Sequence, residues 1–168
     1  VYGSNRYNSN LWLSGVILLV VFMASAFLGY VLPAGQMSYW GASVILNLFS
    51  GIPGLLVGLL GGYSVNSSTV NRFLLFHFVV PFVGLIVTVI HIIYLHGLGS
   101  STGDNKGGNR HGRVSTSYVN FYSNYIAKDI VSIIVLVMLL ALLVYYSIVV
   151  VSHADNSIEG NGLVTPSH

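Results

Sequence analysis

Three long apolar runs dominate the chain. They cover residues 11–32, 73–98 and 130–152, and each is more than 20 residues long. A helix needs about 20 apolar residues to cross the hydrocarbon core of a bilayer, and an isolated segment can satisfy its backbone there only as a helix. The pattern therefore predicts an all-α membrane bundle with three transmembrane helices.

The remaining segments are of two kinds. Residues 35–62 are apolar but interrupted by Gly and Pro, which predicts short interfacial helices, with aromatic residues such as Trp40 suited to the interface. Residues 99–127 are rich in Gly, Ser and Asn and predict a polar loop, and residues 153–168 form a polar tail. We expect residues 1–168 to be one membrane unit of a larger bundle, because three helices enclose little volume for a buried cofactor.

Composition narrows the function classes. The 168 residues include only six basic and four acidic ones, against 54% apolar residues, a balance that excludes an ordinary soluble enzyme. A net charge of +2 provides no basic field for nucleic acid. Because cysteine is absent, any protein ligand to a metal must come from histidine.

The basic residues predict an orientation. Under the positive-inside rule, the chain start and residues 99–127 face the negative side, cytoplasm or matrix, and residues 35–62 and the tail face the positive side. Only Arg72 lies opposite the other basic residues, which are Arg6, Lys106, Arg110, Arg113 and Lys128. Since the chain starts at a valine with no transit or signal pattern, we expect it to be part of a larger protein.

Two histidines in the second run share one helix face. His77 and His91 are 14 residues apart, which is about 21 Å along a helix and close to four full turns. Intramembrane histidines are functional candidates, and neutral imidazole is an axial ligand of haem iron. Two such ligands near opposite membrane faces suit two stacked cofactors, although each imidazole could instead bond a neighbouring helix carbonyl.

Glycines repeat with the same period. Gly84 falls midway between the two histidines, and Gly15 and Gly29 in the first run are also 14 residues apart. Matched periods on two helices suggest flat macrocycles pressed against glycine backbone. The alternative is close packing of helices at small residues.

Three polar residues could meet at the negative side. His96 is rotated by about 140° from the His91 stripe and so is no third ligand there. With Lys128 and Asp129 it could exchange protons with a reducible ligand. Spacing alone favours the simpler interpretation of a snorkelling lysine and an aspartate at a helix start.

Five blocks of sequence carry a family resemblance. They are AFLGYVLPAGQMSYWGASVILNL, GGYSV, RFLLFHFVVPF, HIIYLHGLGS and YIAKDI. Together they resemble mitochondrial cytochrome b over nearly the whole chain, in the part with that family's third to fifth transmembrane helices. The resemblance implies the haem-bearing, quinone-oxidising and quinone-reducing subunit of ubiquinol–cytochrome c oxidoreductase, respiratory complex III.

The resemblance also implies site residues. His77 matches a ligand of the low-potential haem iron and His91 a ligand of the high-potential haem iron, with each second histidine outside this chain. Gly15 and Gly29 match glycines that pack against the two b-type haems. The implied quinol-oxidation pocket is Met23, Phe27, Tyr30, Gly35, Gly41 and Ile45. The implied quinone-reduction pocket is His96, Lys128 and Asp129.

A function, partners and location follow from the resemblance as expectations. The chain would carry electrons from ubiquinol through the haems in the Q cycle, coupled to proton translocation, in the mitochondrial inner membrane with residues 99–127 on the matrix side. Its partners would be the remaining cytochrome b segments or chains, a Rieske iron–sulfur protein, a cytochrome c1-type subunit and the other subunits of a dimeric complex III. No nucleic acid is expected.

Several features depart from the family pattern. Ala34 stands where LPxGQMS usually has an aromatic residue, residues 53–61 are shortened, and the loop before Phe121 is longer and lacks its His-Pro. The family's first two helices, its Pro-Glu-Trp-Tyr signature and its last three helices are absent. We therefore expect a central piece of cytochrome b, from a fragmented gene or a partial sequence.

Two other classes of function remain as alternatives. One is a structural membrane subunit without a redox centre, in which the histidines only brace helices. The other is a di-haem anchor of a different respiratory dehydrogenase, for which a small bundle would be normal. The LPxGQMSxWGA-like block weighs against both.

Overall fold

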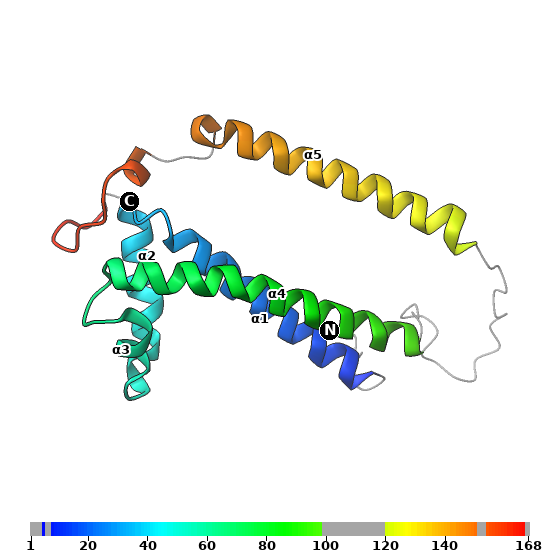
Figure 1. The fold of residues 1–168 in the computed structure, drawn as a ribbon, viewed down its shortest axis with the longest axis horizontal. Coiled ribbons are helices and arrows are strands. Elements are labelled where there is room, and N and C mark those ends of the chain that lie inside the picture. The colour runs from blue at the N-terminus through cyan, green and yellow to red at the C-terminus, as the bar shows by residue number, and fades with distance from the viewer. Residues whose placement is uncertain (1–4, 6–7, 99–119, 151–153, 167–168) are drawn as a thin grey trace, which may run out of the picture. The chain divides into compact units, whose positions relative to one another are not determined.

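The predicted membrane fold is confirmed. A computed structural model describes residue 5 and residues 8–98, 120–150 and 154–166, and its long elements are helices (Figure 1). Three of them, at residues 9–31, 67–97 and 122–146, are long and apolar enough to cross a membrane. Described residues of 1–105 and 154–168 form one compact unit and those of 106–153 a second, and each unit is described by itself.

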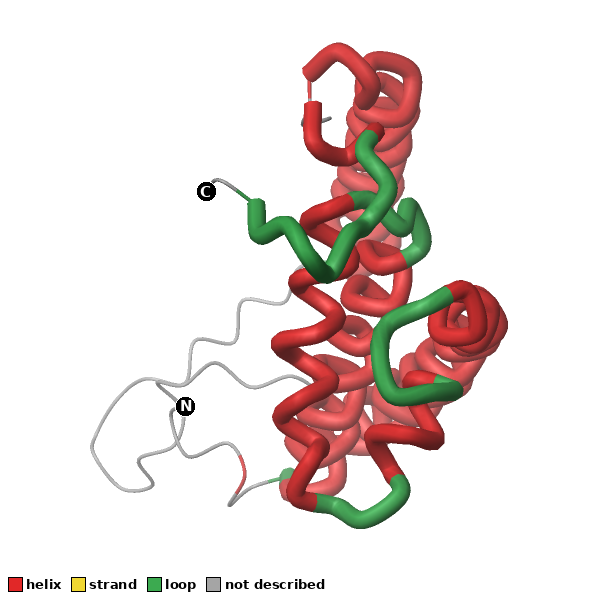
Figure 2. The backbone as a smooth tube through the Cα atoms, turned by 90° about the vertical axis from the view of Figure 1, so that its left-hand side faces the viewer, coloured by secondary structure: helices red, strands yellow, loops and turns green. Residues whose placement is uncertain are grey.

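Two long helices form the body of the first unit. α1 (Ser9–Val31) and α4 (Ser67–Leu98) lie side by side and antiparallel (Figures 1 and 2). α4 starts six residues before Phe73, where its apolar run begins. The Asn66 side chain accepts hydrogen bonds from the backbone N–H groups of the first turn, at 2.8 and 3.2 Å. This N-cap explains why the helix starts among polar residues, before its apolar run begins.

Short helices cross one end of this pair. They are α2 (Gln36–Asn47), the 3₁₀ turn η2 (Leu48–Gly51) and α3 (Leu55–Leu60), and Figure 1 shows them running across the axes of α1 and α4. Gly54 and Gly61 flank α3 with φ of +76° and +73°, a region open mainly to glycine.

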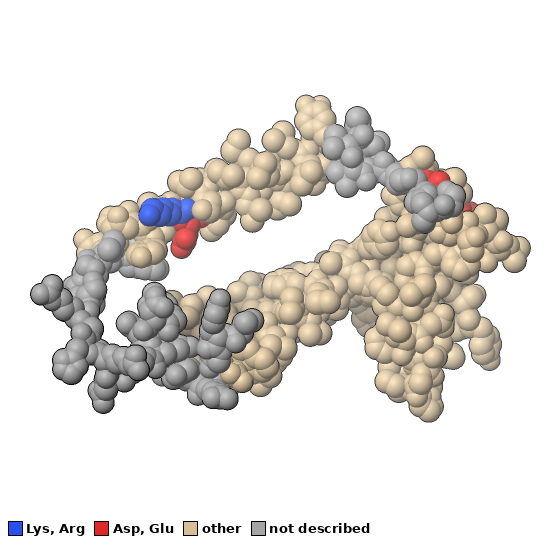
Figure 3. All heavy atoms as spheres, turned by 180° about the vertical axis from the view of Figure 1, so that it is seen from behind, with Lys and Arg blue, Asp and Glu red and all other residues tan. Residues whose placement is uncertain are grey.

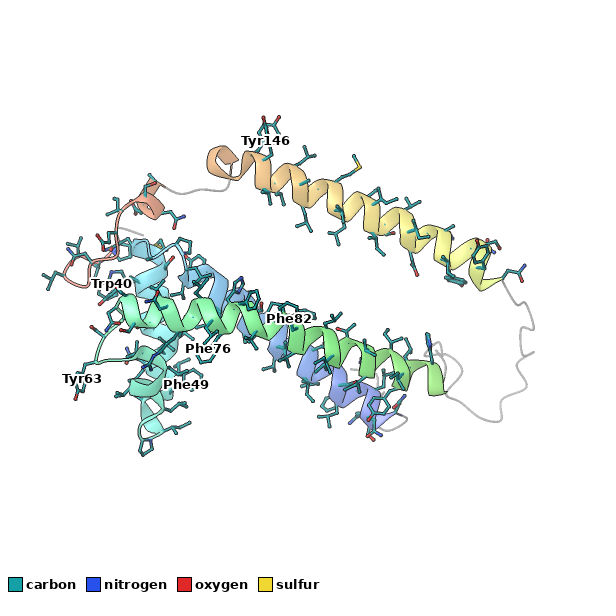
Figure 4. All side chains as sticks on the ribbon, viewed as in Figure 1. Trp40, Phe49, Tyr63, Phe76, Phe82 and Tyr146 are labelled. Atoms are coloured by element: carbon teal, nitrogen blue, oxygen red, sulfur yellow. The ribbon has the colours of Figure 1, made fainter. Side chains whose placement is uncertain are left out.

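The buried core of the described residues lies at this crossing. Its side chains come from α1, α2, α3 and α4, namely Leu28, Val31, Ala42, Leu46, Leu60 and Phe73. Trp40 and Tyr63 lie at the same end (Figure 4), which suits amphipathic rings at a membrane interface. Away from the crossing, the outer faces of α1 and α4 expose apolar side chains, and the described residues in Figure 3 show few Lys, Arg, Asp or Glu side chains. These faces suit lipid or other membrane helices.

The second unit contains α5 (Ala127–Val150), preceded by a π-helical turn, η4 (Phe121–Ile126). The turn falls within the predicted polar loop and shows that the helical conformation begins before the apolar run. The rest of the predicted loop, residues 99–119, lies outside the described residues, as do four of the basic residues used to predict orientation, Arg6, Lys106, Arg110 and Arg113.

Ala34 has a left-handed backbone, with φ of +53°. This conformation costs about 1 kcal/mol for a residue with a Cβ, and the exposed Ala34 side chain offers little packing in return. We expect Ala34→Gly to stabilise the protein by up to about 1 kcal/mol, measured by thermal unfolding of the purified membrane complex. The matched control is Ala24→Gly inside α1, which should destabilise by about 1 kcal/mol. An equal loss in both variants would show that the Ala34 backbone is not strained.

Candidate haem and quinone sites

His77 lies on the side of α4 that faces α1. Its Nδ1 is 2.9 Å from the backbone oxygen of Ser25. A carbonyl oxygen only accepts, so Nδ1 carries the proton and donates it, and the lone pair for a metal is on Nε2. Gly29 lies under the ring, because a Cβ there would be 2.7 Å from His77 Cε1.

His91 has a matching arrangement about four turns further along α4. Its Nδ1 is 2.8 Å from the Ser14 hydroxyl oxygen, and a Cβ added at Gly15 would be 3.4 Å from its Cε1. A groove of about 350 Å³ adjoins the ring, lined by Trp12, Gly15 and Leu19 among others. His91 therefore also has an anchored Nδ1 next to a glycine, beside open space.

The two Gly–His pairs share one helix register. Fourteen residues separate Gly15 from Gly29 on α1, and fourteen separate His77 from His91 on the antiparallel α4. The contacts of Gly29 with His77 and of Gly15 with His91 are therefore repeats of one another, about 21 Å apart along the helix.

Gly84, midway between the histidines, has a different environment. It is buried, and a Cβ there would be 3.3 Å from Val21 Cγ1 and 3.6 Å from Phe22 Cε1 of α1. The contact with α1 side chains is the close packing of helices at small residues that was the alternative interpretation of these glycines.

The histidine arrangement fits axial ligation. Among the described residues no group of three or more His, Cys, Asp or Glu side chains gathers to hold a metal ion. An iron held in a macrocycle needs only axial ligands from protein, and a metal-binding histidine normally donates its other N–H to a carbonyl or hydroxyl oxygen. His77 and His91 both meet that requirement.

The residues predicted to form the quinol-oxidation pocket are only partly brought together. Gly41 lies against Tyr30, since a Cβ there would be 3.4 Å from Tyr30 Cε1. Phe27 instead packs edge-to-face on Phe73, with ring centroids 5.8 Å apart, beside the core. Met23 and Ile45 are exposed apolar side chains.

The C-terminal tail docks on the start of α2. Gln36 is buried, and its side chain accepts from the backbone N–H of Asn161 at 2.8 Å and donates to the carbonyl of Val164. Trp40 Nε1 donates to the same Val164 carbonyl at 3.0 Å. Gly35, a predicted pocket residue, lies against the tail, where a Cβ would be 2.8 Å from the backbone oxygen of Asn156.

A cavity of about 430 Å³ lies beside this docked tail. Ala34, Tyr39, Asn66 and Glu159 are among its lining residues. The sequence does not predict this cavity, because the cavity depends on contact between the tail and residues more than 100 positions earlier.

The predicted quinone-reduction residues belong to both units. His96 is exposed in the last turn of α4, whereas Lys128 and Asp129 are exposed in the first turn of α5. Because each unit is described by itself, a pocket made by these three residues stays a prediction.

Two contact residues were missed by the sequence analysis. Ser14 directly precedes Gly15 in the first apolar run, and a polar residue within a membrane span, next to a repeated glycine, was a usable signal. Gln36 carried no such signal, since its partner lies 125 residues away.

Comparisons of the sequence with a family profile and with single proteins agree on one family. The profile of the family described as Cytochrome b/b6/petB matches residues 1–99. The chain is 45% identical over 165 residues to a cytochrome b of Toxoplasma gondii, covering 98% of this chain and 43% of the relative. It is 41% identical over 172 residues to a cytochrome b of Rickettsia prowazekii, covering 99% and 42%. The chain thus spans less than half the length of these relatives.

A solved structure has the same fold. It is titled Hyperthermophilic respiratory Complex III and matches with a TM-score of 0.73 at 24% identity, over 99% of this chain and 47% of that one. At this identity the match supports the helical arrangement alone.

Proposed function

The chain belongs to the cytochrome b family, and on that premise we propose that it is the haem- and quinone-binding central part of a cytochrome b in respiratory complex III. In this role it transfers electrons from ubiquinol across the membrane through two b-type haems in the Q cycle, coupled to proton translocation. It acts as part of an oxidoreductase and is inactive alone.

The main support is the pair of matching histidine sites. His77 and His91 each have Nδ1 bonded to an oxygen of α1 and a glycine of α1 beneath the ring. We assign His77 to the low-potential haem and His91 to the high-potential haem, with the second axial histidines from another segment or chain. When bound, each haem supplies one-electron redox chemistry, and the residues here hold and orient it.

The quinone pockets are part of the same proposal. Tyr30 and Gly41, in contact with one another, form one wall of the quinol-oxidation pocket, and the docked tail borders it at Gly35. The rest of that pocket is Met23, Phe27 and Ile45. At the opposite membrane side, His96, Lys128 and Asp129 form the quinone-reduction pocket, where His96 and Asp129 exchange protons with quinone.

The proposal includes a location and partners. The chain lies in the mitochondrial inner membrane, with its start and residues 99–127 on the matrix side. The contact of the tail with α2 supports a common membrane side for these two segments. Further cytochrome b segments, a Rieske iron–sulfur protein and a cytochrome c1-type subunit complete a dimeric complex.

A spectrum of the native complex tests this function. We expect the dithionite-reduced minus ferricyanide-oxidised spectrum of the gently purified complex to contain two b-type components. Mass spectrometry should find chains with the missing helices, and a flavin-containing partner would indicate the dehydrogenase anchor instead. An intact complex without b-type haem would overturn the proposal and leave a structural subunit.

A further inference from the structure

Ser14 is a buried hydroxyl in the second turn of α1, a helix long and apolar enough to span a membrane. It is 5% exposed, and a buried hydroxyl is costly unless it is hydrogen-bonded. Its Oγ lies 2.9 Å from the Leu11 carbonyl oxygen and 2.8 Å from His91 Nδ1. The bond to Leu11 is an ordinary helix back-bond, whereas the contact with His91 joins α1 to α4.

The two contacts together determine which atom donates. A serine hydroxyl has one proton, and the carbonyl oxygen of Leu11 can only accept it. Ser14 Oγ must then accept from His91, so the proton of the imidazole is on Nδ1 and the lone pair on Nε2. The α1 serine therefore selects the tautomer that can bind iron through Nε2.

We propose that Ser14 is a positioning residue that orients the His91 imidazole and lowers the midpoint potential of the haem that His91 binds. This inference rests on the proposed haem-binding function. An acceptor on Nδ1–H makes the imidazole a stronger electron donor. A stronger donor stabilises the ferric over the ferrous state and so disfavours reduction.

His77 provides an internal comparison. Its Nδ1 donates to a backbone carbonyl, that of Ser25, which a side-chain substitution leaves in place. Because His91 uses a hydroxyl instead, only the His91 site can lose its acceptor through one substitution. A substitution at Ser14 should therefore change the midpoint potential of one haem and leave that of the other unchanged.

The test is a redox titration of the complete complex with Ser14→Ala. The bond to Nδ1–H should be stronger in the ferric than in the ferrous state, so its loss should change the oxidised-to-reduced ratio of one b-type component by about threefold. At 59 mV per tenfold change, that is a rise of about 28 mV. The other component should keep its potential.

Two further variants separate tuning from packing. Ser14→Thr retains the hydroxyl and should restore the wild-type potential. Ser43→Ala removes a hydroxyl that donates to the carbonyl of Tyr39 in its own helix, at 2.8 Å, and should shift neither component. An additional readout is the electron paramagnetic resonance spectrum of the ferric haems at low temperature. The g values of one low-spin signal should change in Ser14→Ala and in neither of these two variants.

Other outcomes are decisive against the inference. Unchanged potentials in a Ser14→Ala complex with both haems present, or equal shifts of both components, would overturn it while leaving the proposed function intact. If Ser14→Ala does not assemble, Ser14→Cys supplies a weaker acceptor of similar size. That variant should shift the same component in the same direction, and an unchanged potential would again overturn the inference. Absence of b-type haem from the wild-type complex would remove the proposed function itself, and this inference with it.

Discussion

His77→Ala is expected to abolish one of two b-type haem signals and to leave much of the other. The substitution removes the only imidazole on its part of the α4 stripe, because the next histidine, His91, lies about 21 Å along the helix. A haem without this axial ligand loses its low-spin spectrum. The measurement is a reduced-minus-oxidised spectrum combined with a redox titration, in which the low-potential component should disappear.

Two histidines on the same helix provide the controls. His91→Ala should remove the high-potential component instead, and His96→Ala, an exposed histidine off the stripe, should retain both. Each spectrum is normalised to the amount of assembled chain in the sample. Complete retention of both components in His77→Ala, in a fully assembled complex, would contradict the ligand assignment.

The spans and the histidine stripe were readable from the sequence because both depend on local periodicity. A run of more than 20 apolar residues predicts a membrane-spanning helix, and a 14-residue interval places two residues on the same face of it. The residues at which the helices start were harder to predict from the sequence. α4 starts directly after the polar cap residue Asn66, before its apolar run, and the π-helical turn before α5 also lies outside the apolar run.

Contacts between distant segments could not be read in this way. The bond between Ser14 and His91 requires the antiparallel register of α1 and α4, which the pattern of neither helix determines alone. The same holds for the docking of Asn161 on Gln36, since a tail rich in Gly and Asn has many equivalent registers. The different surroundings of Gly84 follow from the same register, because it faces Val21 and Phe22 instead of a histidine, and its predicted packing against haem stays a prediction.

Gly29→Ala is expected to disrupt the His77 site strongly. The added Cβ would lie 2.7 Å from His77 Cε1 and 3.1 Å from Nε2, closer than carbon atoms can approach without displacement. The ring cannot simply rotate away, because its Nδ1 is bonded to the Ser25 carbonyl. We expect loss of most of the low-potential b-type signal, measured by redox titration of the assembled complex.

Gly15→Ala is the matched control for this prediction. It adds the same methyl group in the same register, but at 3.4 Å from His91 Cε1, an ordinary van der Waals contact, so the high-potential signal should be largely retained. Alanine is also a better helix former than glycine by about 1 kcal/mol, so neither variant should weaken α1. A selective loss in Gly29→Ala therefore cannot come from an unstable helix and must arise at the histidine ring. Equal losses in the two variants would instead indicate that both glycines are needed for close contact with the haems themselves.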